Sequence, residues 1–145
     1  MSLSLGVATM RARATLYLLT ALLAAIPAVS VSAGDRVFEL RTYTTAPGKL
    51  GALNARFRDH TVALFKKHGM EVVAFWEPTD KEAGAGDKLV YVLAHASRAA
   101  AEASWKAFRD DPEWVKVKAE SEAGGPLTTK IESVFLAATD YSPLK

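Results

Sequence analysis

The chain of 145 residues contains no cysteine. No disulfide can therefore hold the fold together, and a thiol nucleophile, a thiolate metal site and a lipid anchor on cysteine are all excluded. Stability has to come from an apolar core, either within one copy of the chain or shared with a partner.

An excess of charge of one sign is also missing from most of the chain. From Gly34 onward, Lys plus Arg and Asp plus Glu number 16 each, because the two surplus cations of the whole chain are Arg11 and Arg13. The charges are interspersed, whereas recognition of nucleic acid needs a net or clustered positive charge. The composition therefore argues against nucleic-acid binding.

Sequence motifs of several enzyme classes are absent as well. Neither a glycine-rich dinucleotide fingerprint nor a nucleophile elbow occurs, and the GAG at 84–86 precedes a strand pattern, not a helix. The three histidines, His60, His68 and His95, include no pair four residues apart, so a metal site is not indicated. We expect no metal and no cofactor.

Residues 1–33 have the pattern of a secretory signal peptide. Two arginines precede an apolar run over 16–29, and small residues follow up to Ala33. We expect translation from Met1 or Met10, cleavage after Ala33, and export of a domain spanning 34–145 to the periplasm or the medium. An uncleaved anchor is the alternative, since such an apolar run approaches the ~20 residues that span a bilayer. Pro27 and the small residues favour cleavage, which leaves no stable membrane association.

Hydrophobic periodicity predicts the elements of the mature domain. In chain order they are a strand at 36–45, a helix at 46–69, strands at 70–78 and 88–96, a helix at 98–110 that restarts at 111–112 and continues to 122, and a strand at 129–139. This order is that of a βαββαβ ferredoxin-like sandwich of the α+β class, a four-stranded antiparallel sheet with helices on one face.

Both faces of the predicted sheet are apolar. In the strand at 88–96, apolar residues occupy both odd and even positions. A strand of a sheet with one solvent-exposed face should instead alternate apolar with polar residues. The helices can cover only one face, so we expect the sheet of an identical subunit to cover the other. The sequence therefore predicts a homodimer.

Four segments together resemble the NIPSNAP family, within the dimeric α/β-barrel superfamily. They are VFELRTYTTAPGKL, LNARFRDHTVALFKKHG, VVAFWEP and SWKAFRDDPEW, and the resemblance extends from about Val37 to about Ala138. It implies a ferredoxin-like monomer that pairs into a dimeric α/β barrel. Relatives in that superfamily range from cofactor-free oxygenases to haem-degrading enzymes and proteins without known activity, so the resemblance implies an architecture more than a reaction.

His60 is the candidate catalytic residue. Its spacing from Leu53, Phe57 and Leu64 predicts that it faces the sheet. There it is either a core histidine with satisfied ring nitrogens or a general base in a cleft between helix and sheet. His68 and His95 fall at the ends of elements, where we expect them to be solvated.

The first strand carries charged residues on one side. Glu39, Arg41 and Tyr43 alternate with Phe38 and Leu40, so they share a face. An internal network of ion pairs and hydroxyls is one interpretation, and binding of a carboxylate-bearing ligand by Arg41 and Tyr43 is the other.

The chain is rich in aromatic residues for its size. These residues either fill the core and an interface or line the site of a flat apolar ligand. The candidates for ligand binding are Phe57, Trp76, Tyr91, Trp105 and Phe108.

Three functions are compatible with these features. The first is an exported homodimer that binds a small apolar or aromatic ligand between sheet and helices. The second is a cofactor-independent monooxygenase-like enzyme assisted by His60. The third is a structural or interaction dimer without a small-molecule site. An enclosed cavity touching His60, Trp76 or Trp105 would favour ligand binding.

Overall fold

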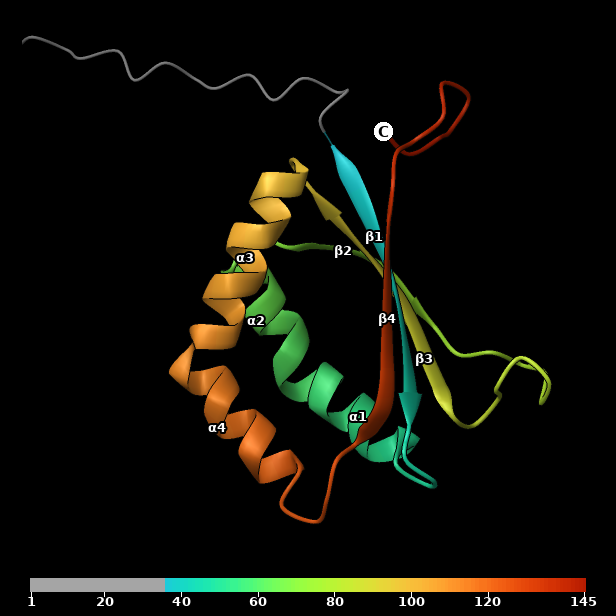
Figure 1. Cartoon of the computed structure of the whole chain (residues 1–145), viewed down its shortest axis with the longest axis vertical. Helices are drawn as coiled ribbons and strands as arrows, with labels where there is room; N and C mark the ends of the chain where they lie inside the picture. The colour runs from blue at the N-terminus through green and yellow to red at the C-terminus, as the bar shows by residue number, and fades with distance from the viewer. Residues whose placement is uncertain (1–35) are drawn as a thin grey trace, which may run out of the picture.

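The computed structural model describes residues 36–145, so the predicted signal peptide lies outside the described residues. The predicted order of strands and helices is confirmed (Figure 1). The elements are β1 (Val37–Thr45), α1 (Leu50–Arg56), a π-helical turn η1 (Phe57–Thr61), α2 (Val62–Lys67), β2 (Glu71–Trp76), β3 (Lys88–His95), α3 (Arg98–Asp110), α4 (Pro112–Ser121) and β4 (Thr128–Leu136).

The four strands form one antiparallel sheet in the order β2-β3-β1-β4. β1 and β3 are central, and β2 and β4 are the edges. All of the helices lie on the same face of the sheet, as Figure 1 shows. The predicted ferredoxin-like α+β sandwich is therefore confirmed. The opposite face of the sheet, which we call the open face, carries none of the helices of residues 36–145.

Local sequence accounts for the ends of the helices. The side chain of Ser97 accepts a hydrogen bond from the Ala100 amide (3.1 Å), and that of Asp111 accepts one from the Glu113 amide (2.9 Å). Each cap satisfies an amide that has no partner within its own helix.

Among residues 36–145, no helix is long and apolar enough to cross a membrane.

The first predicted helix is interrupted by the π-helical turn η1. In this turn the Val62 amide donates to the carbonyl of Phe57, five residues back, and the Thr61 hydroxyl donates to the carbonyl of Arg56 (3.2 Å). A π-helical turn holds one more residue than an α-helical turn. The extra residue rotates everything that follows, so Thr61, only 1% exposed, faces the core in the place predicted for His60.

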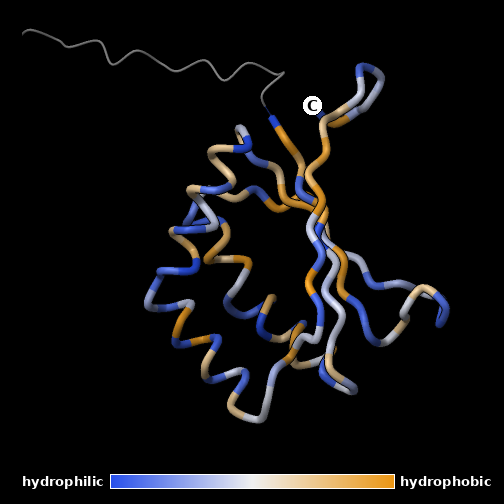
Figure 2. The backbone as a smooth tube through the Cα atoms, viewed as in Figure 1, coloured by the Kyte–Doolittle hydropathy of each residue, from blue (hydrophilic) through white to orange (hydrophobic). Residues whose placement is uncertain are grey.

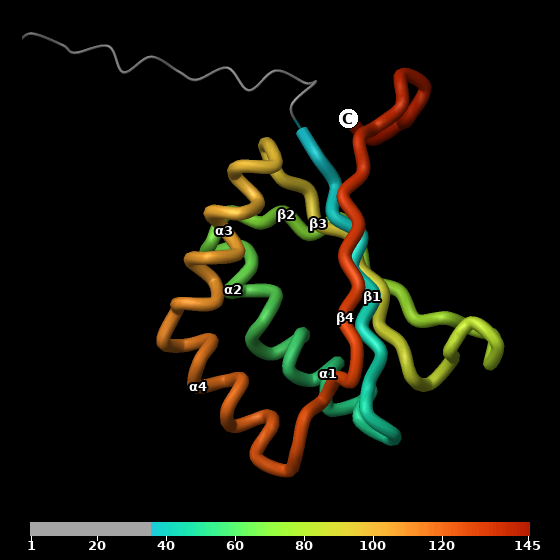
Figure 3. The backbone as a smooth tube through the Cα atoms, in the orientation of Figure 1, coloured from blue at the N-terminus to red at the C-terminus, as the bar shows by residue number. Residues whose placement is uncertain are grey.

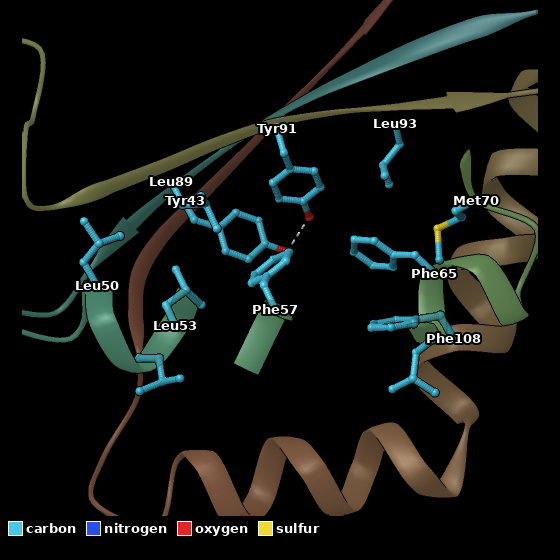
Figure 4. Close-up of a cluster of buried hydrophobic side chains, with 12 residues drawn as sticks. Tyr43, Leu50, Leu53, Phe57, Phe65, Met70, Leu89, Tyr91, Leu93 and Phe108 are labelled. Carbon is cyan, nitrogen blue, oxygen red and sulfur yellow. Dashed lines mark hydrogen bonds between the residues drawn. The ribbon is translucent and has the colours of Figure 1, made fainter. Parts of the chain in front are cut away.

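The core between helices and sheet is aromatic. Phe57 packs edge to face against Tyr43 and Tyr91, with ring centroids 5.7 and 5.3 Å apart. Figure 4 shows these three rings between the leucines of α1 and the Phe65 and Phe108 rings. Burying side chains of this size stabilises the fold by roughly 1.5–3 kcal/mol each.

The open face keeps its hydrophobic residues exposed. Trp76 and Val134 are each 52% exposed and Leu136 is 43% exposed. Figure 2 shows hydrophobic residues along the strands of the sheet. Figure 3 shows that the β2–β3 connection projects away from the helices, while the C-terminal tail hooks back near the start of β1. Both faces of the sheet are apolar, as predicted, and among residues 36–145 the helices cover only one of them.

Candidate functional site

A buried carboxylate, Glu39, lies on the helix-covered face of β1 and is 1% exposed. Its Oε1 accepts hydrogen bonds from Arg41 Nη1 (2.7 Å) and Ser133 Oγ (2.6 Å). Its Oε2 accepts from Trp105 Nε1 (2.6 Å) and His95 Nε2 (3.1 Å). We call these five residues the Glu39 network. It ties β1, β3, β4 and α3 to one another.

The network determines the charge of Glu39. Burial alone would raise the pKa of this carboxyl, but the hydrogen bonds from His95, Ser133, Trp105 and Arg41 outweigh burial and lower the pKa from 4.5 to about 2. Glu39 is therefore ionised at neutral pH and is a poor proton acceptor.

Arg41 is held by protein groups on several sides. Its guanidinium lies 4.2 Å from the centroid of the Trp105 ring, and its Nη2 donates to the Tyr43 hydroxyl (3.4 Å). Burial opposes its positive charge, yet the neighbouring Tyr91, Tyr43 and Glu39 keep the pKa of Arg41 above its ordinary value. The predicted ion-pair and hydroxyl network of Glu39, Arg41 and Tyr43 is thus present.

Two tyrosines extend the network into the aromatic core. The Tyr91 hydroxyl donates to the Tyr43 hydroxyl (3.1 Å), the bond drawn dashed in Figure 4. Burial raises the pKa of Tyr91 well above its ordinary value, so this hydroxyl stays protonated. The Tyr43 hydroxyl lies within hydrogen-bond distance of both Arg41 Nη2 and the Tyr91 hydroxyl, so it joins the Glu39 network to the aromatic core.

A cavity of about 70 Å³ lies beside Tyr43, between the first helical segments, α4 and the sheet. We call it the helix–sheet cavity. A water molecule occupies about 30 Å³ in the liquid, so this cavity holds about two waters or one small polar group. Its lining is Tyr43, Arg56, Phe57, Thr61, Phe65, Phe108, Trp114, Lys118, Glu122, Thr128 and Ile131.

Arg56 supplies the buried charge of this cavity. Its side chain is 4% exposed, and its Nη1 donates to Glu122 Oε1 (2.9 Å) and Ser121 Oγ (3.3 Å). The guanidinium lies 5.2 Å from the centroid of the Trp114 ring, and its Nε has no partner in the part of the chain that the structure describes. Sequence reasoning missed Arg56, although a cation three residues after the inward-facing Leu53 was a usable signal.

His60 does not lie at this cavity. It is exposed, in a groove between the first helix and α4 that Asp59 and Glu120 also line. The prediction that His60 faces the sheet is wrong because η1 turns Thr61 inward instead.

The other predicted site residues lie in different places. Tyr43, Phe57 and Phe108 line the helix–sheet cavity. Tyr91 lies in the core, and Arg41 and Trp105 belong to the Glu39 network. Trp76 lies half-exposed at the edge of the open face, away from all of them.

The predictions for the other two histidines are also wrong. His95 is 3% exposed because α3 and Glu39 cover the end of β3. His68 is half-buried, and its Nε2 lies 2.7 Å from Asp111 Oδ2. Asp111 also pairs with Lys67 Nζ (2.8 Å), and these contacts hold the pKa of Asp111 below its ordinary value. Asp111 thus joins α2 to the start of α4, in keeping with its predicted place at a helix end. Within 36–145, no group of three potential His, Cys, Asp or Glu ligands gathers at one point.

Comparison with known proteins agrees with this architecture. The family model described as NIPSNAP matches residues 38–143. No curated protein sequence matches the chain.

Solved structures show the same fold. A NIPSNAP family protein with unknown function from Agrobacterium tumefaciens is 20% identical, with a TM-score of 0.66 over 77% of this chain and 96% of that one. An uncharacterized NIPSNAP-like domain protein from Burkholderia xenovorans is 14% identical, with a TM-score of 0.66 over 76% of this chain and 90% of that one. At these identities the likeness extends to the fold alone.

Proposed function

The chain belongs to the NIPSNAP family, and we propose that it is an exported homodimer that binds a small ligand with an apolar or aromatic body in the helix–sheet cavity. The observation that carries the proposal is the composition of the cavity lining. Aromatic rings wall the cavity, and Tyr43, Thr61 and the buried Arg56 bring polar groups to it. A specific small-molecule site has this composition, apolar walls with a few polar groups that fix orientation.

The part of the ligand that does not fit in the cavity would lie outside it. At about 70 Å³ the cavity accommodates only one end of a ligand. The rest would lie toward β4, where Thr128 and the 49% exposed Ile131 form the rim. Ile131 then gains a cover that residues 36–145 do not supply.

Binding is better supported than catalysis. The monooxygenase alternative relied on His60 as a base, and His60 is exposed outside the cavity. Glu39 is ionised and already accepts four hydrogen bonds. Neither residue is placed to remove a proton from a ligand in the helix–sheet cavity.

The open face supports the proposal of a dimer. Trp76, Val92 and Leu136 lie together around a shallow apolar hollow on this face. Leaving such residues exposed to solvent forfeits roughly 25 cal/mol of stabilisation for each Å² of apolar surface that could be buried. A second copy with the same surface can cover it face to face.

One measurement addresses the dimer and the ligand together. Native mass spectrometry of the protein purified from its own host should show a dimer with retained small-molecule mass, and the chain should begin at Gly34. Val92→Glu, in the middle of the open face, should yield monomer, whereas Val115→Glu, on the exposed side of α4, should remain dimeric. A compact wild-type monomer at dilute concentration would refute the dimer, and a dimer that never carries or takes up a ligand would refute the binding function.

A further inference from the structure

We propose that a groove between the outer side of α2 and the start of β2 binds an apolar chain with an anionic group at each end, that is, a long-chain dicarboxylate. We call it the α2–β2 groove. It shares no lining residue with the helix–sheet cavity, so the inference goes beyond the proposed function and does not depend on it. The size of the groove, its apolar floor and two cations placed along it carry the inference.

The α2–β2 groove has the size and the surface of a small-molecule site. Its volume is about 600 Å³, whereas sites for small molecules typically measure about 300–1,000 Å³ and are mostly apolar. Met70, only 2% exposed, shows that the groove reaches down to the hydrophobic core. The apolar and small residues of the lining are Val62, Ala63, Gly69, Met70 and Val72.

Two cations line the same groove. Arg58 on η1 and Lys66 on α2 are exposed, and neither forms a salt bridge within residues 36–145. The next residue, Lys67, differs because it pairs with Asp111. Glu71 is the one acidic residue among the described lining residues, and it already pairs with Arg36 (2.9 Å). The groove therefore offers two positive charges to a ligand without a carboxylate of its own to balance them.

The spacing of the two cations sets the length of the ligand. Arg58 and Lys66 are eight residues apart, which at about 1.5 Å per residue separates them by about 12 Å along the helix. The half-buried Val62 lies halfway between them and lines the groove. An extended apolar chain of this length covers the floor and brings one anion to each cation. A monoanion would leave one cation without a counter-charge, and a neutral chain would leave both.

The test compares ligands with the same chain on the protein purified from its host. Isothermal titration calorimetry measures the affinity for decanedioate, for decanoate and for the corresponding diol. Decanedioate should bind most tightly, although decanoate is the more hydrophobic acid. Hexanedioate, which is too short to reach both cations, should bind more weakly than decanedioate. NMR should place decanedioate in the groove through shifts of the Gly69 and Val72 amide signals.

Matched variants test the two cations. Arg58→Gln and Lys66→Gln each remove one charge from an exposed position, so both variants should fold normally. Each should weaken decanedioate about two- to fivefold, the value of one exposed ion pair. Lys106 is an exposed cation on α3 that pairs with Asp110, and Lys106→Gln is the control that should change nothing.

Several results would overturn the inference. If decanoate or the diol binds as tightly as decanedioate, the second anion is not recognised. If both glutamine variants bind decanedioate like wild type, the cations are not used. If nothing binds, or if the shifts are confined to Thr61 and Phe108 in the helix–sheet cavity, the groove is not the site. The last pattern would support the proposed function, which native mass spectrometry tests independently.

Discussion

Substituting Glu39 with glutamine (Glu39→Gln) tests whether the Glu39 network stabilises the fold as an ion pair. The substitution keeps the shape of the side chain and replaces one acceptor oxygen by an NH₂ group. Whichever way the amide is turned, one group that can only donate, Arg41 or Trp105, then faces the NH₂ group. Arg41 also loses the carboxylate that neutralises it.

Two independent arguments give the same magnitude. Removing one partner of a buried ion pair typically costs about 3–5 kcal/mol. A carboxyl whose pKa falls from 4.5 to about 2 on folding contributes about 3 kcal/mol at neutral pH, at 1.36 kcal/mol for each pH unit. We therefore expect Glu39→Gln to lower the free energy of unfolding by about 3–5 kcal/mol, a large share of the roughly 5–15 kcal/mol of a typical domain.

The pH dependence has a definite sign. Because folding lowers the pKa of Glu39, its contribution is fully present above pH 4.5 and is lost as the pH falls toward 2. Urea denaturation at fixed protein concentration should therefore show a large gap between wild type and Glu39→Gln at pH 7, and the gap should narrow below pH 4.5. Glu102→Gln is the control, since Glu102 on α3 is exposed and its substitution should leave the midpoint nearly unchanged. A variant as stable as wild type at pH 7, or a gap that stays constant from pH 5 to pH 3, would refute the reasoning.

Three further substitutions test single features of the fold. His60→Ala should change the free energy of unfolding by less than about 0.5 kcal/mol because His60 is exposed, and a larger loss in denaturant titration would mean that it packs inward. Thr61→Val removes the hydroxyl bond to the Arg56 carbonyl inside η1 and should cost about 1 kcal/mol by the same titration, with NMR shifts confined to the turn; unchanged stability and spectra would contradict its role. Ser97→Ala should cost about 1 kcal/mol in thermal unfolding through loss of the α3 cap, whereas Ser142→Ala, in the C-terminal tail, should have little effect.

Much of the fold was predictable because the signals are local. Alternation in β1 placed Glu39, Arg41 and Tyr43 on one face, and Ser97 and Asp111 marked the starts of two helices. The aromatic lining of the cavity was predictable in part, since Phe57 and Phe108 follow the helical repeat. These features depend on neighbours within a few residues along the chain.

The errors and omissions concern long-range contacts or a local irregularity. The spacing of His60 in the sequence is that of a core-facing position in a regular α-helix. The π-helical turn η1 contains one additional residue, and this places His60 on the surface. His95 ends a strand, where exposure is the usual expectation, yet Glu39 lies 56 residues away in sequence and binds it in the core. Arg56 acquires its role from Glu122, 66 residues along the chain.

The sequence by itself thus determined the order of the elements, the two apolar faces of the sheet and the charged stripe on β1, because side-chain periodicity encodes which side of an element is buried. Only the tertiary structure decided which polar groups meet inside, because pairing depends on packing between segments far apart in the chain. The Nε of Arg56, which has no partner among residues 36–145, belongs to this second kind of information, since an absent acceptor can be recognised only when the neighbours are in place.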